Sequence, residues 1–258
     1  MQSLANRLAI QHFVNAYTQE TGKGHLLNKN QQSLQQQAFS QGLRFDMKTI
    51  SQQLPDYFEY HEDGTQYYLR QVQYPQDIPL LHQWMHEPHV IPQWQLNKSE
   101  LDLQVYFDKM LADDHQRLLI VGVDGKDVGY TEIYEGKRDR LGRYYEGDDN
   151  DLGWHLLFGD KSVFGKGFLR PTIRLLSFYI FEHSQAKKIV GEPDHTVKPY
   201  AAVVAELCYE TQRLIPMPEK TAMLYYCFRE TFYNKFGEYY QTSQQQLADK
   251  PAKILSVT

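Results

Sequence analysis

The stretch Gly153-Trp154-His155-Leu156-Leu157-Phe158-Gly159, followed by Phe164-Gly165-Lys166-Gly167-Phe168, predicts a strand, a glycine loop and then a helix over about 169–181. Glycines let a backbone approach a ligand closely, and the first amides of a helix suit a phosphate or pyrophosphate. The loop is neither a GxxxxGK[ST] phosphate loop nor a GxGxxG dinucleotide fingerprint. On its own, therefore, the unit is compatible with a bound pyrophosphate and with a tight turn that binds nothing.

Strands and helices alternate on both sides of this unit. The Asp124-Gly125 pair predicts the turn of a hairpin, and Ser99 is a plausible helix N-cap. The other predicted strands are 66–72, 118–123, 128–134, 188–192, 213–216 and 223–229, and the other predicted helices are 75–87, 99–112 and 200–207. This order predicts an α/β layer fold with a mixed sheet.

Residues 1–60 differ in composition from the rest of the chain. Leu4, Leu8, Ile10, Phe13, Val14 and Tyr17 recur at helical spacing, and a Gln-rich run follows over 31–37. We therefore expect a helical, Gln-rich N-terminal extension over 1–60 and one α/β domain over 61–258.

The composition is that of a globular protein. The 258 residues carry a formal charge of −5, with 41% hydrophobic and 23% charged residues. Bulk disorder and fibrous repeats are excluded, and a net acidic chain is a poor candidate for binding nucleic-acid phosphates. We expect no nucleic-acid partner.

The cysteines and the N-terminus indicate the compartment. Cys208 and Cys227 lie among apolar residues without metal-ligand spacing, so they are expected to be buried thiols in a reducing environment. Polar residues interrupt the first sixteen positions, which therefore lack the apolar core of a signal peptide, and no run of 18 apolar residues occurs. We expect a cytoplasmic protein with no membrane partner and no metal.

The two glycine-containing stretches, with Gly191-Glu192-Pro193-Asp194, resemble in order and spacing the siderophore-biosynthesis branch of the GCN5-related N-acetyltransferase (GNAT) superfamily. That branch acylates N-hydroxylated amines and includes aerobactin-type hydroxylysine acetyltransferases and the mycobactin lysine acyltransferase. Further similar segments are Leu81-His82-Gln83-Trp84-Met85-His86-Glu87-Pro88-His89-Val90 with Trp94, Tyr130-Thr131-Glu132-Ile133-Tyr134, and Pro218-Glu219-Lys220-Thr221-Ala222-Met223-Leu224. The resemblance covers about residues 66–236 and implies a mixed, mostly antiparallel sheet flanked by helices.

The resemblance also implies the reaction. An acyl group, by default acetyl from acetyl-CoA, would pass directly to a small N-hydroxylated amine within a ternary complex, without an acyl-enzyme. N-hydroxyputrescine, N-hydroxycadaverine or N6-hydroxylysine is the expected acceptor, and the product is a siderophore hydroxamate. The pyrophosphate loop maps onto Phe164, Gly165, Lys166, Gly167 and Phe168, and the strand that pairs with the pantetheine arm onto Leu156, Leu157 and Phe158.

Three positions depart from the family pattern. Ser162 stands where the superfamily has Gln or Arg, Val197 where the branch has Asn, and Cys208-Tyr209 where it has Gly-Phe. These departures weaken the case for side-chain contacts to coenzyme A but leave the backbone contacts.

The family pattern points to His155 and Asp194 as the catalytic residues. An imidazole near its ordinary pKa can take or position a proton at neutral pH. Because a hydroxylamine nitrogen is less basic than an alkylamine, the base would mainly orient it and accept its proton late. Asp194 would bind the hydroxylamine, hold His155 or receive the proton. The residues expected to line the acceptor pocket are Trp154, Tyr134, His82 and Trp94.

Two charge patterns favour different acceptors. The acidic run over 146–151 favours a cationic diamine through its negative field. Arg138, Arg140 and Arg143 favour a carboxylate-bearing acceptor such as hydroxylysine. Both acceptors remain open at this level.

Two other functions are compatible with the sequence. One is an acetyltransferase for plain polyamines or aminoglycosides, because aminoglycoside acetyltransferases share the superfamily. The other is a non-catalytic acyl-CoA-binding module that docks on a siderophore synthetase through residues 1–60. The presence of both His155 and Asp194 argues against a pure binding module.

Overall fold

The computed structural model describes residues 48–249. The predicted N-terminal helix and the Gln-rich run therefore lie outside the described residues, and the division at residue 60 stays a prediction. Within 48–249, no helix is both long and apolar enough to span a membrane.

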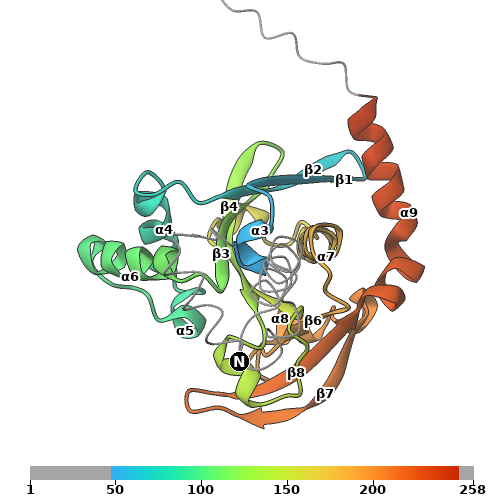
Figure 1. Cartoon of the computed structure of the whole chain (residues 1–258). Coiled ribbons are helices and arrows are strands. Elements are labelled where there is room, and N and C mark those ends of the chain that lie inside the picture. Colours follow the sequence, from blue (N-terminus) through green and yellow to red (C-terminus); the bar gives the residue numbers. More distant parts are fainter. Residues whose placement is uncertain (1–47, 250–258) are drawn as a thin grey trace, which may run out of the picture.

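One eight-stranded sheet forms the centre of the molecule (Figure 1). Its order is β1-β2-β3-β4-β5-β6-β8-β7, and β5 and β6 are its one parallel pair among the described residues. The strands are β1 (Tyr57–Glu62), β2 (Thr65–Gln71), β3 (Gln116–Val123), β4 (Lys126–Glu135), β5 (Leu152–Phe158), β6 (Lys188–Gly191), β7 (Tyr209–Pro216) and β8 (Thr221–Phe228). The predicted mixed, mostly antiparallel sheet is confirmed, and β1 spans the predicted boundary at residue 60.

Helices cover both faces of the sheet (Figure 1). The α-helices are α3 (Ile50–Gln53), α4 (Ile78–Met85), α5 (Ile91–Trp94), α6 (Glu100–Ala112), α7 (Leu169–His183), α8 (Lys198–Ala201) and α9 (Arg229–Ala248). Alternating residues of β3 feed two cores: Leu118 and Ile120 pack with α4 and α6, whereas Leu119 and Val121 pack with α7. The period-two alternation of a strand accounts for this division.

The prediction of a continuous helix over 200–207 is wrong. The chain forms the short helix α8 and then a 3₁₀ turn, η4 (Ala205–Leu207). Tight turns replace the helix, with Val203 N donating to Tyr200 O at 2.9 Å and Leu207 N to Val204 O at 3.0 Å. Val203, Val204 and Leu207 are all buried, and the turns bring these nearly consecutive apolar residues to the core together.

Cys208, at the end of this segment, is one of the departures from the family pattern. Cys208 has φ +64°, in the left-handed region that favours glycine. The family's usual glycine suits this conformation, whereas Cys208 adopts it at a cost in backbone energy. The following Tyr209 is buried, and its hydroxyl meets Trp154 Nε1 at 2.8 Å and Ser177 Oγ at 2.9 Å. This packing holds Cys208 in place.

The sheet opens between β5 and β6. The two strands pair only at Leu152–Ile189 and Gly153–Val190. Beyond Gly153, β5 continues to Phe158 paired with β4 alone. One backbone edge of β5 therefore faces a gap, which is the place where an extended ligand can add hydrogen bonds to a strand.

Candidate active site

A cavity of about 630 Å³ lies at the gap. It is lined by residues from α5, α6, the strands β3 to β5, and the segments after β6. Of the sequence-predicted site residues, those that line it are His155, Asp194, Trp154, Tyr134, Trp94, Leu156 and Phe158. The structure thus brings residues from four separate motifs into one cavity.

Some predicted residues lie elsewhere. His82 does not line this cavity; its ring lies on α4, 4.2 Å from the ring of His86. Leu157 faces away from the gap and packs with α4 and α6. The roles of both residues in binding stay predictions.

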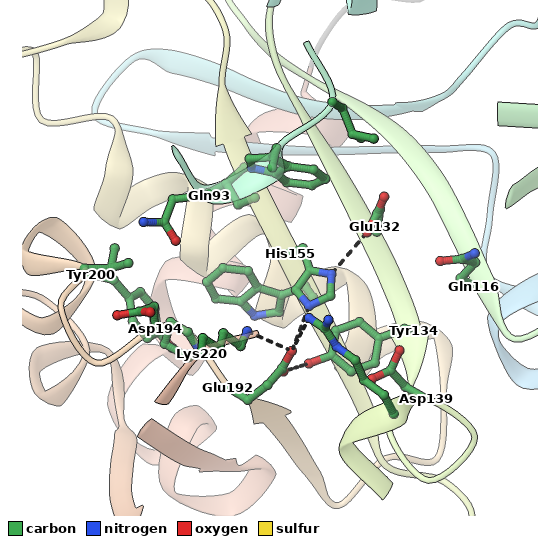
Figure 2. Close-up of a pocket in the computed structure, with 18 of the residues that line it drawn as sticks. Gln93, Gln116, Glu132, Tyr134, Asp139, His155, Glu192, Asp194, Tyr200 and Lys220 are labelled. Atoms are coloured by element: carbon green, nitrogen blue, oxygen red, sulfur yellow. Dashed lines mark hydrogen bonds and ion pairs between the residues drawn. The ribbon is translucent and has the colours of Figure 1, made fainter. Parts of the chain in front are cut away.

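His155 lies between two glutamates (Figure 2). The β4–β5 register places Glu132 directly opposite His155, with Oε2 3.1 Å from Nδ1. On the other side, Glu192 Oε1 lies 3.0 Å from Nε2. The imidazole is 29% exposed, whereas the side chains of Glu132 and Glu192 are 8% and 0% exposed. The ring therefore meets the cavity while its carboxylates are buried behind it.

Glu192 is the centre of a charge network. Tyr134 donates its hydroxyl to Oε2 at 2.5 Å, and Lys220 Nζ and Arg140 Nη2 lie 3.5 and 3.7 Å from Oε1 (Figure 2). Burial acts to raise the pKa of Glu192, but the charge and hydrogen bond of His155, with Lys220 and Tyr134, hold that pKa well below its usual range. Glu192 is consequently ionised.

The same contacts set the state of His155. Burial acts to lower the pKa of the imidazole, but the charge of Glu192 and hydrogen bonds to Glu132 and Glu192 outweigh it and raise the pKa to about 10. The ring is therefore an imidazolium at neutral pH in the unliganded site. The sequence-based expectation of an imidazole near its ordinary pKa differs from this state.

Asp194 has different partners from those expected. Its Oδ1 accepts from Thr196 N at 2.8 Å and Thr196 Oγ1 at 2.6 Å, and these bonds lower its pKa. The carboxylates on His155 are Glu132 and Glu192 instead. Asp194 lines the cavity toward Tyr200 (Figure 2), and its catalytic role stays a prediction.

Sequence reasoning missed both glutamates, although signals for them existed. Glu132 follows from pairing the predicted hairpin strand with the next strand, because that register sets it across from His155. Glu192 stands in the same motif as Asp194. A buried ionic contact to a ring on another strand has no local signature in the sequence.

Aromatic rings complete the wall around His155. The ring of Tyr134 lies 4.7 Å from the imidazole and that of Trp94 lies 6.4 Å away. Trp154, the neighbour of His155 on β5, also lines the cavity, and its Nε1 donates to the Tyr209 hydroxyl at 2.8 Å. These rings restrict the orientation of the imidazole and exclude water from part of its surroundings.

The acidic run over 146–151 lies away from the cavity. Two of its carboxylates form ion pairs, Asp149 with Lys137 and Asp151 with Lys188, each at 2.8 Å. None of residues 146–151 lines the cavity. These residues therefore do not contact an acceptor in the cavity, and their effect through a long-range field stays a prediction.

The three arginines are also separated by the fold. Arg138 pairs with Glu135 at 3.2 Å. Arg140 alone of the three lines the cavity, and it pairs with Glu219 at 2.5 Å. Two carboxylates that the sequence reading did not single out, Asp113 and Asp139, line the same part of the cavity and flank His115. The charge at this end is therefore mixed.

The glycine loop precedes α7 and is exposed to solvent. Gly165 and Gly167 have φ of +75° and +79°, which L-residues rarely adopt. The loop faces the acceptor-side helices, since the Phe164 ring lies 4.8 Å from His89 and Lys161 pairs with Glu87 at 2.6 Å. An open β5 edge that leads to a glycine loop and a 15-residue helix fits a pantetheine arm followed by a pyrophosphate.

Comparison with known proteins identifies the family of this fold and cavity. A family model described as an acetyltransferase (GNAT) domain matches residues 73–217. This chain belongs to the GNAT family. It is an acyltransferase enzyme of that family, as the sequence resemblance predicted.

Individual relatives indicate to which branch of the family the chain belongs. The chain is 57% identical over 204 residues to an N-hydroxyputrescine acetyltransferase of Acinetobacter baumannii, covering 79% of this chain and 98% of the relative. It is 30% identical over 122 residues to the lysine N-acyltransferase MbtK of Mycobacterium tuberculosis, covering 46% and 57%. A solved aminoglycoside acetyltransferase in complex with coenzyme A shares the fold, with a TM-score of 0.59, 23% identity, and coverage of 64% and 96%. The predicted siderophore branch is confirmed.

Proposed function

We propose that this enzyme transfers the acetyl group of acetyl-CoA to the hydroxylamine nitrogen of an N-hydroxylated diamine, N-hydroxyputrescine or a close homologue, in siderophore biosynthesis. The observation that carries the proposal is the position of His155, beside the open edge of β5 in a single cavity. The relative named for N-hydroxyputrescine supports the choice of acceptor. The product is a hydroxamate, a bidentate ligand for iron(III).

The residues divide between the two substrates. The backbone of Leu156 to Phe158 would pair with the pantetheine arm, and the loop from Phe164 to Phe168 with the first amides of α7 would hold the pyrophosphate. The acceptor would enter from the side of α5 and α6, past Trp94. Its nitrogen would then meet the thioester next to His155. Both substrates bind together, so no acyl-enzyme is required.

The charges of the cavity favour a diamine over an amino acid. Arg140 is paired with Glu219, so its charge is already compensated. Asp113 and Asp139 both contact His115, and two carboxylates against one ring leave negative charge at this end of the cavity for the second, cationic nitrogen of a diamine. A hydroxylated amino acid is the second candidate, because Lys109 and Arg140 also line the cavity and suit a carboxylate.

A coenzyme A thiol-release assay tests the proposal. Acetyl-CoA is offered with N-hydroxyputrescine, N-hydroxycadaverine, N6-hydroxylysine and the parent amines. Turnover confined to a hydroxylated diamine is expected. Preference for N6-hydroxylysine would establish the second candidate, and equal turnover of the parent amines would contradict both.

The assay also tests the binding-module alternative. An acyl-CoA-binding module would bind acetyl-CoA, transfer nothing, and keep its affinity in His155→Ala. Docking on a siderophore synthetase through residues 1–60, and a cytoplasmic location, stay predictions.

A further inference from the structure

The hydrogen-bond contacts of His155 bear on how the enzyme selects its acceptor. Each ring nitrogen lies within hydrogen-bond distance of a different carboxylate, Glu132 at 3.1 Å and Glu192 at 3.0 Å. An ionised carboxylate can only accept a hydrogen bond. Both contacts are satisfied together only when a proton lies between the ring and the carboxylate on each side. Neither ring nitrogen then keeps a free lone pair.

Glu132, His155 and Glu192 form a row of three ionisable side chains, and the groups that face this row maintain its charge. They are Tyr130 and Tyr134 from β4, Arg140 from η2 (Arg140–Arg143), Lys220 before β8 and Trp94 from α5, with Asp139 and Asp194 in the same cavity. Tyr130 donates to Glu132 Oε1 at 3.0 Å, and two cations lie within 4 Å of Glu192. Each carboxylate therefore has partners besides the ring, a hydroxyl donor on Glu132 and two cations near Glu192.

We propose that the Glu132–His155–Glu192 row selects the acceptor by its protonation state: the row offers no free base, so only an acceptor whose nitrogen is already neutral can attack the thioester. This inference rests on the proposed function. A hydroxylamine nitrogen is less basic than an alkylamine and is neutral at neutral pH. A plain diamine is a dication there, and the row cannot deprotonate it.

The proton balance of the transfer agrees with such a row. The acceptor nitrogen forms a bond to the thioester carbonyl carbon, and the C–S bond breaks with its electron pair leaving on sulfur. The nitrogen loses one proton and the thiolate gains one. The row ends with the two protons it began with. Meanwhile the exposed part of the positive ring stabilises the oxyanion of the tetrahedral intermediate.

The state of the ring is tested by nitrogen NMR of the histidine side chains, with His155→Asn used to assign the signals. In the wild-type enzyme without substrates, His155 is expected to keep both ring protons between about pH 6 and pH 9, where an ordinary histidine loses one. In Glu192→Gln it is expected to titrate near the ordinary range. A wild-type midpoint near the ordinary range would overturn the proposal.

Selectivity is tested by the ratio of kcat/KM for N-hydroxyputrescine to that for putrescine at about pH 8. The ratio is expected to fall by roughly tenfold or more in Glu192→Gln, because a His155 with an ordinary pKa is mostly a free base there. Glu132→Gln provides a second variant if Glu192→Gln does not fold. Glu182→Gln is the matched control, since Glu182 is exposed near the end of α7, contacts Tyr233 and does not line the cavity; it is expected to keep the ratio.

The two proposals fail differently. If no hydroxylated diamine is acetylated, the proposed function is wrong whatever the NMR shows. If it is acetylated but the ratio is unchanged in both glutamine variants, the selection by protonation state is wrong alone.

Discussion

The two ends of the cavity work by different physical means. At the acceptor end, three ionisable side chains from β4, β5 and the segment after β6 are placed in contact by strand register. At the coenzyme A end, the groups on offer are an open strand edge, two glycines in left-handed conformations and the amides of α7. Side-chain chemistry therefore governs the first end, and backbone geometry governs the second. Substitutions should consequently change different kinetic constants at the two ends.

The largest effect is expected from His155→Ala. Removing the charged ring is expected to lower kcat by about two to three orders of magnitude, the range for losing one group that stabilises the oxyanion. The affinity for acetyl-CoA, measured by calorimetry, is expected to change little. A kcat within threefold of the parent would remove His155 from the mechanism.

A smaller effect is expected at the other end, from Gly167→Val. A β-branched residue at φ +79° is strained, so the loop would move away from the pyrophosphate. The KM for acetyl-CoA is expected to rise by roughly tenfold, with the KM for the acceptor nearly unchanged. An equal rise in both constants would show that the two ends are not separate.

The ionisable groups at the acceptor end should make thermal stability depend on pH. The pKa of His155 is raised from 6.5 to about 10, so its contribution to stability is complete below about pH 6.5 and is lost as the pH rises toward 10. The pKa of Glu192 is lowered, so its contribution is present above its usual range and is lost on acidification. Thermal melts of the wild type should show the melting temperature falling toward high pH, the alkaline limb, and toward low pH, the acid limb.

In Glu192→Gln, which leaves His155 with one carboxylate partner, the alkaline limb should flatten and the acid limb should shift. Melting curves of Gly167→Val, whose substitution lies outside this network, should keep the shape of the wild type. Identical pH profiles for Glu192→Gln and the wild type would contradict the assignment of these limbs.

The smallest effect is expected from Lys166→Ala. Lys166 is exposed between the two glycines, and the backbone is expected to carry most of the contact to the pyrophosphate. Losing one exposed charge should raise the KM for acetyl-CoA by about threefold or less. A tenfold rise at low salt that disappears at high salt would instead show that the lysine charge dominates.

The sequence predicted the coenzyme A end of the cavity better than the acceptor end. The strand, the glycine loop and helix α7 were predictable, because glycines and apolar periodicity are local signals. The mixed, mostly antiparallel sheet and the family also followed from the motifs. The contacts of His155 did not, because they depend on residues 23 and 37 positions away in the chain.

Two elements were missed for physical reasons. Helix α9 (Arg229–Ala248) is polar along much of its length and has little apolar periodicity, although Phe232 and Phe236 anchor it. Strand β1 lies in the region read as an N-terminal extension, and its place is fixed by pairing with β2. Both elements are defined by tertiary packing more than by local pattern.

One hydrogen bond links the two ends of the cavity. His89, on the connection between α4 and α5, lies with Nε2 2.7 Å from the carbonyl oxygen of Phe158, at the end of the open strand. The loop that borders the acceptor side is thus fastened to the strand proposed to receive acetyl-CoA. Occupancy of one site should therefore alter affinity at the other, and by reciprocity the converse holds to the same degree. Initial-velocity patterns with both substrates varied would measure this coupling.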